Sequence, residues 1–66
     1  MNTLDLHGIR HDEVDRLVEN FVLLKTPPLR IITGNSDRMK ELVIKVLDRC
    51  NIEYEQFRPG QITILK

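Results

Sequence analysis

Two stretches of the chain carry apolar residues at intervals of three and four positions, which is the spacing of one face of an α-helix. The first predicted helix opens at His11 or Asp12, either of which can cap it. It ends at Thr26–Pro28, because proline cannot continue a helix. The second opens with Ser36 as its cap and runs to Cys50. The two apolar stripes consist of Val14, Leu17, Val18, Phe21 and Leu24, and of Met39, Leu42, Val43, Val46, Leu47 and Cys50.

Four shorter segments rich in apolar and β-branched residues predict strands. They are Thr3–Leu6, Leu29–Thr33, Ile52–Phe57 and Gln61–Leu65. A short turn at Pro59–Gly60 separates the last two, which favours an antiparallel hairpin. Because strand–helix–strand units cross over with the same hand, both helices are expected on one face of the sheet. We therefore predict an α/β fold, a two-layer β-α-β-α-β-β sandwich with a mixed four-stranded sheet and one open sheet face.

Chain length and composition limit the protein to one domain, residues 1–66, since so short a chain cannot build a second core. Ten basic residues balance ten acidic ones, so any phosphate-binding surface must be a local cluster. Cys50 is the single cysteine, and no stretch resembles a membrane span or a secretory signal. We expect a cytoplasmic protein without membrane contact, monomeric rather than dimeric, although exposed edge strands leave dimerisation open.

The carboxyl ends of the first two predicted strands meet at one edge of the sheet, and each strand continues there into a helix. Unpaired backbone N–H groups and the helix dipole attract anions to such helix N-termini. We therefore predict a phosphate-binding rim, although many strand-to-helix turns contain a glycine without holding any ligand. The candidate binding residues of the two turns and their flanks are Gly8, Arg10, His11, Thr33, Gly34, Asn35, Ser36 and Arg38.

Asp5 and His7 are separated by one residue of a predicted strand, so their side chains share a face. Leu4 and Leu6 then share the other face, beneath the helices. On the open face the carboxylate can orient the imidazole, which can act as a general acid or base near neutral pH. A polar strand edge explains the same spacing without catalysis, and a capping role explains His11.

Asp5, His7, His11 and Asp12 can also be interpreted as a metal cluster. These residues do not have a recognised ligand spacing. We therefore predict no metal site and no cofactor, while assistance by a divalent ion stays open.

Tyr54 and Phe57 are two of only three aromatic residues in the chain, and they have two interpretations. Either can stack on a nucleobase, as aromatic side chains do in many RNA-binding proteins, or pack against the core. Met39 and Cys50 are expected in the core, where a free cysteine behaves as a small apolar residue.

Leu4–Gly8 reads Leu-Asp-Leu-His-Gly and is followed by a helix opening at Asp12–Val14. This segment resembles the first motif of the small MutS-related (Smr) domain family. Ile31–Gly34, followed by an amphipathic helix, resembles the second motif, a Thr-Gly-x-Gly loop. The turn Pro59–Gln61 and the strand Ile62–Leu65 are similar to the end of these domains.

This resemblance implies a fold similar to the C-terminal domain of bacterial translation initiation factor three. Smr domains nick DNA and, in several lineages, cleave RNA. The resemblance ties Asp5 and His7 to cleavage and Thr33 and Gly34 to substrate binding. Ser36 stands where the family has its second glycine. Serine resists a positive φ angle, so a backbone cradle would be altered there, although its hydroxyl can itself contact a phosphate.

We therefore expect an endonuclease that cleaves phosphodiester bonds in RNA or structured DNA. His7 would transfer the proton, and Asp5 would orient the imidazole ring of His7. Two other hypotheses stay open: a non-catalytic module that binds nucleic acid or the ribosome, and an adaptor that binds a protein through its open sheet face.

Overall fold

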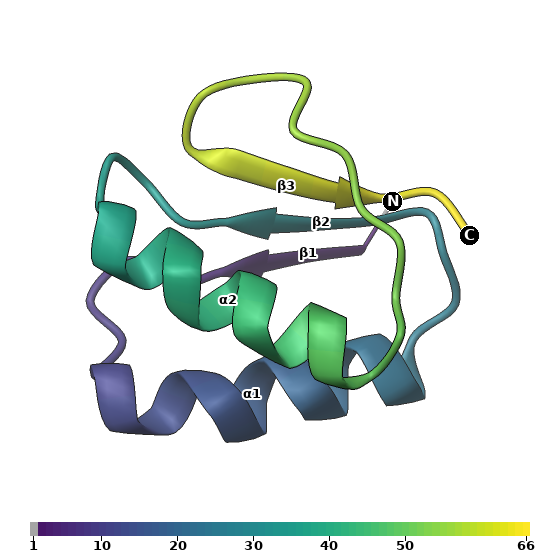
Figure 1. The fold of residues 1–66 in the computed structure, drawn as a ribbon, viewed down its shortest axis with the longest axis horizontal. Helices are drawn as coiled ribbons and strands as arrows, with labels where there is room; N and C mark the ends of the chain where they lie inside the picture. The colour runs from purple at the N-terminus through teal and green to yellow at the C-terminus, as the bar shows by residue number, and fades with distance from the viewer. Residues whose placement is uncertain (1) are drawn as a thin grey trace.

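The computed structural model describes residues 2–66, which form two helices and a three-stranded sheet (Figure 1). The elements are strand β1 (Asn2–Asp5), helix α1 (His11–Leu24), strand β2 (Leu29–Ile32), helix α2 (Asp37–Arg49) and strand β3 (Gln61–Ile64). Strand β2 is central, with β1 parallel to it and β3 antiparallel. The predicted α/β class, the mixed sheet and the order of these five elements are confirmed.

The core lies between the sheet and the two helices, which pack against each other. Alternate residues of β2 and β3 are buried under the helices, as is Leu6, which directly follows β1. The buried strand side chains are Leu29, Ile31, Ile62 and Ile64. Helix α1 contributes Val14 and Val18, while Leu24 of the predicted stripe is exposed because it lies at the end of the helix. Met39 is buried and Cys50 is half-buried against the core. Within residues 2–66, neither helix has the length and apolar character needed to cross a bilayer.

The predicted fourth strand, Ile52–Phe57, is reduced to a single bridge. Glu55 and Thr63 pair antiparallel, and the backbone N–H of each donates to the carbonyl of the other at 2.8 Å. Only two side chains of this segment pack against the core, and residues 56–59 are exposed. Without buried side chains the segment does not continue as a strand. The prediction of a four-stranded sheet was therefore wrong, although the antiparallel direction was correct.

The two helices begin in different ways. Arg10 occupies the cap position of α1 without any side-chain capping bond, so the prediction that His11 or Asp12 caps this helix was wrong. Both residues lie in its first turn, because the chain reverses at Gly8 and becomes helical directly afterwards. Ser36 caps α2 as predicted, since its Oγ accepts a hydrogen bond from the backbone N–H of Met39 at 3.1 Å.

Candidate active site

Three turns meet at the end of the sheet where both helices begin (Figure 1). The backbone N–H of Leu6 donates to the carbonyl of Ile32 at 3.0 Å, which extends the β1–β2 pairing into the first turn. The carbonyl of Gly60 accepts hydrogen bonds from the N–H groups of Thr33 and Gly34, at 2.8 and 3.2 Å. The sequence predicted that the turns after β1 and β2 lie together at this edge of the sheet, the rim. It did not predict Gly60, which comes from the turn before β3.

Asp5 and His7 form a hydrogen-bonded pair on the exposed side of this rim. Oδ1 of Asp5 accepts from the backbone N–H of His7 at 2.9 Å and lies 2.8 Å from Nδ1 of its ring. The backbone bond, and next the ring bond, hold the pKa of the Asp5 carboxyl below its usual value. An ionised carboxylate only accepts hydrogen bonds, so Nδ1 is the donor of this bond, and a neutral ring with its proton on Nδ1 has a lone pair at Nε2.

Nε2 of His7 lies against the backbone of Gly34. A Cβ atom added at Gly34 would be only 3.1 Å from Nε2, and Gly34 has a φ of +68°. Gly60 is equally constrained, because a Cβ atom there would be 3.2 Å from the Gly34 carbonyl oxygen. The imidazole is therefore held between a carboxylate and a glycine backbone, while its side chain stays 68% exposed.

The fold that carries this pair matches a known domain. Comparison with solved structures aligns 96% of this chain with 99% of the crystallised human small-MutS related domain, at a TM-score of 0.64 and 30% sequence identity. This chain belongs to the small-MutS related (Smr) domain family. The resemblance inferred from the sequence motifs is confirmed. Comparisons of the sequence with family profiles and with curated proteins give no match. The likeness to translation initiation factor three stays a prediction.

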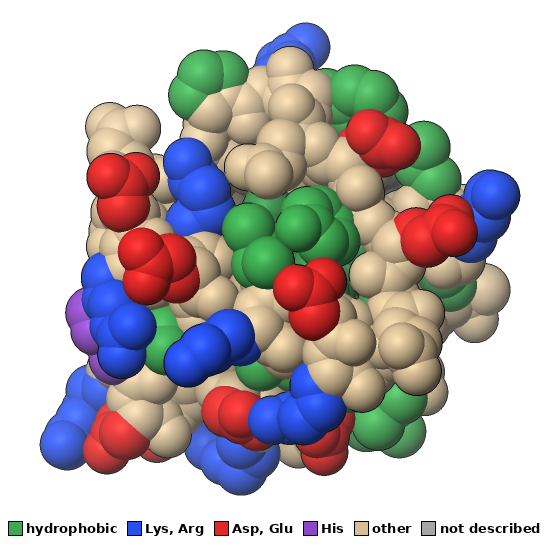
Figure 2. Space-filling model, viewed as in Figure 1, with side chains coloured by type: hydrophobic (Ala, Val, Ile, Leu, Met, Phe, Trp, Pro, Cys, Tyr) green, Lys and Arg blue, Asp and Glu red, His purple; other side chains and the backbone are tan. Residues whose placement is uncertain are grey.

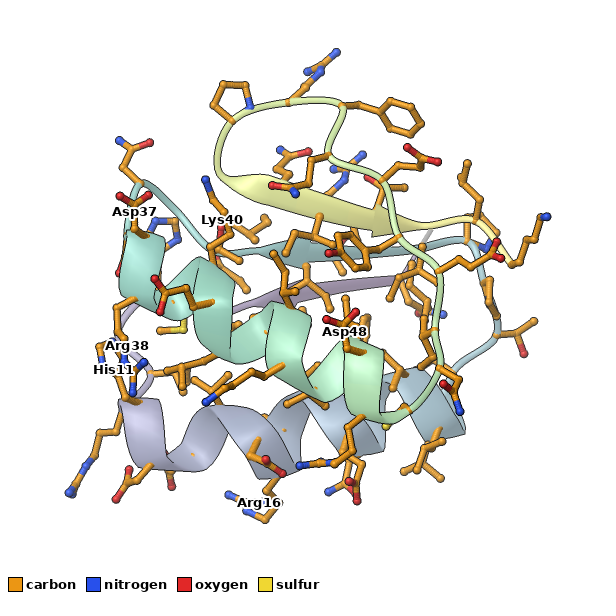
Figure 3. All side chains as sticks on the ribbon, in the orientation of Figure 1. His11, Arg16, Asp37, Arg38, Lys40 and Asp48 are labelled. Atoms are coloured by element: carbon orange, nitrogen blue, oxygen red, sulfur yellow. The ribbon has the colours of Figure 1, made fainter. Side chains whose placement is uncertain are left out.

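Exposed basic side chains lie where the two helices of this Smr domain begin. Figure 3 shows His11 and Arg38 at the end of the molecule where the helices begin. Arg10 forms an ion pair with Asp12 at 3.5 Å, and Arg38 forms one with Glu41 at 3.6 Å. All these side chains are open to solvent, so the ion pairs are weak enough for a phosphate to compete with them.

The turn after β2 is built by contacts within itself. Thr33 is only 5% exposed and its hydroxyl donates to the Gly34 carbonyl at 3.2 Å, so this side chain supports the turn from inside. Asn35 and Ser36 are exposed. Ser36 has a φ of −83°, so the position where the family has its second glycine does not need glycine in this chain.

The turn after β1 leaves open space at Gly8. This glycine has a φ of +75°, and a Cβ atom added to it would meet nothing within 4 Å. Gly8 therefore serves the chain reversal between the strand and α1, in contrast to the close contact at Gly34.

No group of three or more His, Cys, Asp or Glu side chains in residues 2–66 is arranged to hold a metal ion. Asp5 and His7 contact each other, whereas His11 and Asp12 belong to the following helix. A divalent ion acting at this rim would need to take most of its ligands from the substrate or from water.

Proposed function

We propose that this Smr domain is an endonuclease that cleaves phosphodiester bonds in RNA or structured DNA. The observation that carries the proposal is the Asp5–His7 pair, an exposed and oriented imidazole whose Nε2 lies beside Gly34. Two helix N-termini begin at the same rim, and their free N–H groups favour a bound phosphate. The nuclease activity of the Smr family supports the same assignment.

In the proposed reaction, Nε2 of His7 takes the proton of the attacking group, a 2′-hydroxyl or a water molecule. The new P–O bond forms as the bond to the leaving oxygen breaks, and that oxygen takes a proton from the imidazolium or from solvent. Asp5 keeps the ring in place and stabilises the imidazolium. Backbone N–H groups of the rim, with Arg10 and Arg38, stabilise the charge that develops on the phosphate oxygens.

The test compares wild-type protein with His7→Ala and Asp5→Asn in two assays, nicking of supercoiled plasmid and cutting of labelled RNA. His7→Ala is expected to slow cleavage by about 100- to 10,000-fold, which is the usual contribution of a general acid or base. Asp5→Asn is expected to abolish most activity as well, because an amide cannot stabilise the imidazolium. Wild-type rates in both variants would contradict the proposal.

Asp48→Asn is the matched control, because Asp48 is an exposed acid in the last turn of α2, far from the rim (Figure 3). This variant is expected to cleave at the wild-type rate. Asp5 and His7 are themselves exposed, so all three variants should keep the circular dichroism spectrum of the wild type. Repeating each assay with a chelator determines whether a divalent ion assists.

A second candidate function is a module that binds nucleic acid or the ribosome without cleaving it. The observation favouring it is Ser36, which replaces the second glycine of the family motif. Binding without cleavage by the wild-type protein, with or without a divalent ion, would select this candidate. In both cases we propose a cytoplasmic, monomeric protein with nucleic acid as its partner.

A further inference from the structure

A hollow of about 270 Å³ lies on the face of the sheet opposite the helices. The side chains that line it are Arg30, Phe57, Arg58, Gln61, Thr63 and Leu65. Arg30 and Thr63 are register partners, and their chain neighbours Leu29, Ile31 and Ile62 are buried under the helices. Side chains alternate along a strand, so the hollow belongs to the other face. Its volume is just below the ~300–1,000 Å³ of pockets for drug-sized ligands, which suits a group the size of one nucleoside.

The lining combines an aromatic ring with unpaired positive charge. Phe57 is 65% exposed and Leu65 is 53% exposed, so both present apolar surface to a ligand. In residues 2–66, neither Arg30 nor Arg58 takes part in an ion pair. The other arginines each pair with an acid, and they are Arg10, Arg16, Arg38 and Arg49. The two guanidinium groups without an ion pair in the described part of the chain, residues 2–66, therefore border the same hollow.

The hollow and the Asp5–His7 pair share one face of the sheet. In the strand register, Asp5 pairs with Ile32, and Ile32 pairs with Gln61 at the border of the hollow. Two strand spacings place Asp5 about 10 Å from Gln61 across the sheet. One extended polymer can therefore contact the hollow and the rim at the same time.

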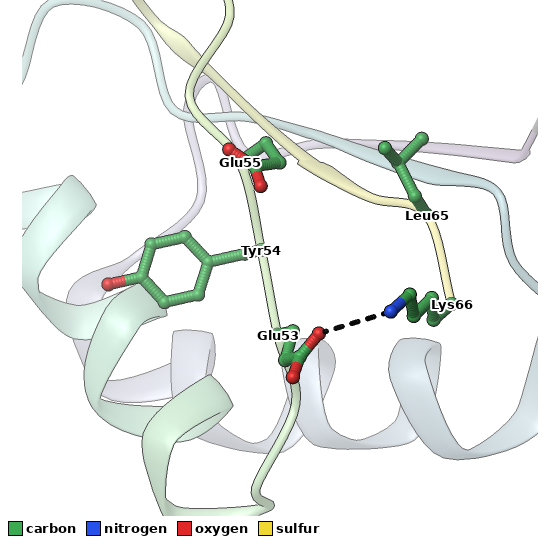
Figure 4. A pocket seen from close by; sticks show the side chains of 5 residues that line it. All are labelled: Glu53, Tyr54, Glu55, Leu65 and Lys66. Carbon is green, nitrogen blue, oxygen red and sulfur yellow. Dashed lines mark ion pairs between the residues drawn. The ribbon is translucent and has the colours of Figure 1, made fainter.

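The surroundings favour a path along the open face. On the helix face, positive and negative side chains are interspersed without a basic patch (Figure 2). Beyond Leu65, a smaller hollow of about 110 Å³ is bordered by Glu53 and Glu55, and Lys66 neutralises only Glu53, at 3.8 Å (Figure 4). A polyanion would be repelled by this acidic corner and attracted to the side of the hollow that carries Arg30.

We propose that the hollow binds a base of a single-stranded nucleic acid segment next to the scissile phosphate. Phe57 stacks on the base, and Arg30 and Arg58 contact the flanking phosphates. A duplex does not fit this role, because its stacked bases offer no free face to an aromatic ring. The position of the scissile bond rests on the proposed nuclease function, whereas the binding of a single strand does not.

The first test measures the affinity of a labelled oligouridine by fluorescence anisotropy. Phe57→Ala is expected to weaken binding by about 5- to 150-fold, the range found when a stacking aromatic is removed. Phe57→Tyr keeps the ring and should keep the affinity, whereas Phe57→Leu should lose it. Phe57 is largely exposed, so these variants should remain folded, which circular dichroism checks. Equal affinity of wild type and Phe57→Ala would overturn the inference.

The second test measures how binding depends on salt. Arg30→Gln and Arg58→Gln should each reduce the slope of log affinity against log salt concentration by about 0.7, the value for one phosphate contact to a single strand. Arg16→Gln is the matched control, because Arg16 pairs with Glu13 on α1 and does not border the hollow. Unchanged slopes for Arg30→Gln and Arg58→Gln would overturn the inference.

The outcomes separate this inference from the nuclease proposal. A protein that binds oligouridine through Phe57 and cleaves nothing would contradict only the nuclease function. A protein that cleaves, with Phe57→Ala binding and cutting as the wild type does, would contradict only the inference. Equal affinity for a duplex of the same length would also overturn it. The inference would also be overturned if ultracentrifugation showed a dimer that Phe57→Ala dissociates, while the affinity for oligouridine stayed unchanged.

Discussion

At the scale of single residues, the candidate site depends on the orientation of one imidazole. Strand alternation was sufficient to predict that Asp5 and His7 share an exposed face, because it only required Leu6 to be buried. The protonation of Nδ1 could not be predicted from the sequence. It follows from Oδ1 of Asp5, which accepts from both the backbone and the ring of His7. The contact of Nε2 with Gly34 joins residues far apart in the chain, so no local pattern indicates it.

Gly34→Ala is expected to displace the His7 ring. The added Cβ atom would lie 3.1 Å from Nε2, and a φ of +68° costs an alanine about 1–2 kcal/mol. Gly8→Ala is the matched control, because it has a φ of +75° with nothing within 4 Å. Chemical denaturation should show a similar loss of stability in both variants. Nitrogen NMR should show a shifted His7 ring only in Gly34→Ala, and an unshifted ring would contradict the described contact.

At the scale of elements, the helices were easier to predict than the strands. Apolar periodicity and prolines define α1, and Ser36 defines the start of α2, since these signals are local. The segment Ile52–Phe57 has the composition of a strand, yet it makes one bridge, because its pairing depends on how much of it the core covers. The same segment carries Phe57 to the open face. The hollow therefore could not be predicted from the sequence. Base stacking was, however, one of the two interpretations of the Phe57 side chain.

Ser36→Ala is expected to lower the free energy of unfolding by about 1 kcal/mol, because α2 loses the bond between Oγ and the N–H of Met39. Arg10→Ser is the converse change, since α1 has no side-chain cap, and it should raise the free energy of unfolding. Urea denaturation measures both. An unchanged unfolding midpoint in Ser36→Ala would show that the cap does not stabilise the helix.

At the scale of the whole molecule, a net charge of zero conceals an uneven distribution of cations. Arg49 of α2 donates hydrogen bonds to Asp15 and Glu19 of α1 and so links the two helices, and its hydrogen bonds hold the pKa of the Asp15 carboxyl below its usual value. Arg30 and Arg58 border the hollow on the open sheet face. Composition alone could only require that a phosphate-binding surface be local. The fold determines which arginines pair with acids and which are available to a polyanion.

The central claim is that Asp5 orients His7 so that its Nε2 can take the proton of the group that attacks the phosphate of a bound nucleic acid. The most direct measurement is a nitrogen NMR spectrum of the neutral histidine rings, recorded while a 2′-O-methyl oligonucleotide that cannot be cleaved is added. We predict that Nδ1 of His7 carries the proton throughout and that the Nε2 resonance moves on binding. A proton on Nε2 in the free protein, or an Nε2 resonance that does not move while the oligonucleotide binds, would contradict the account.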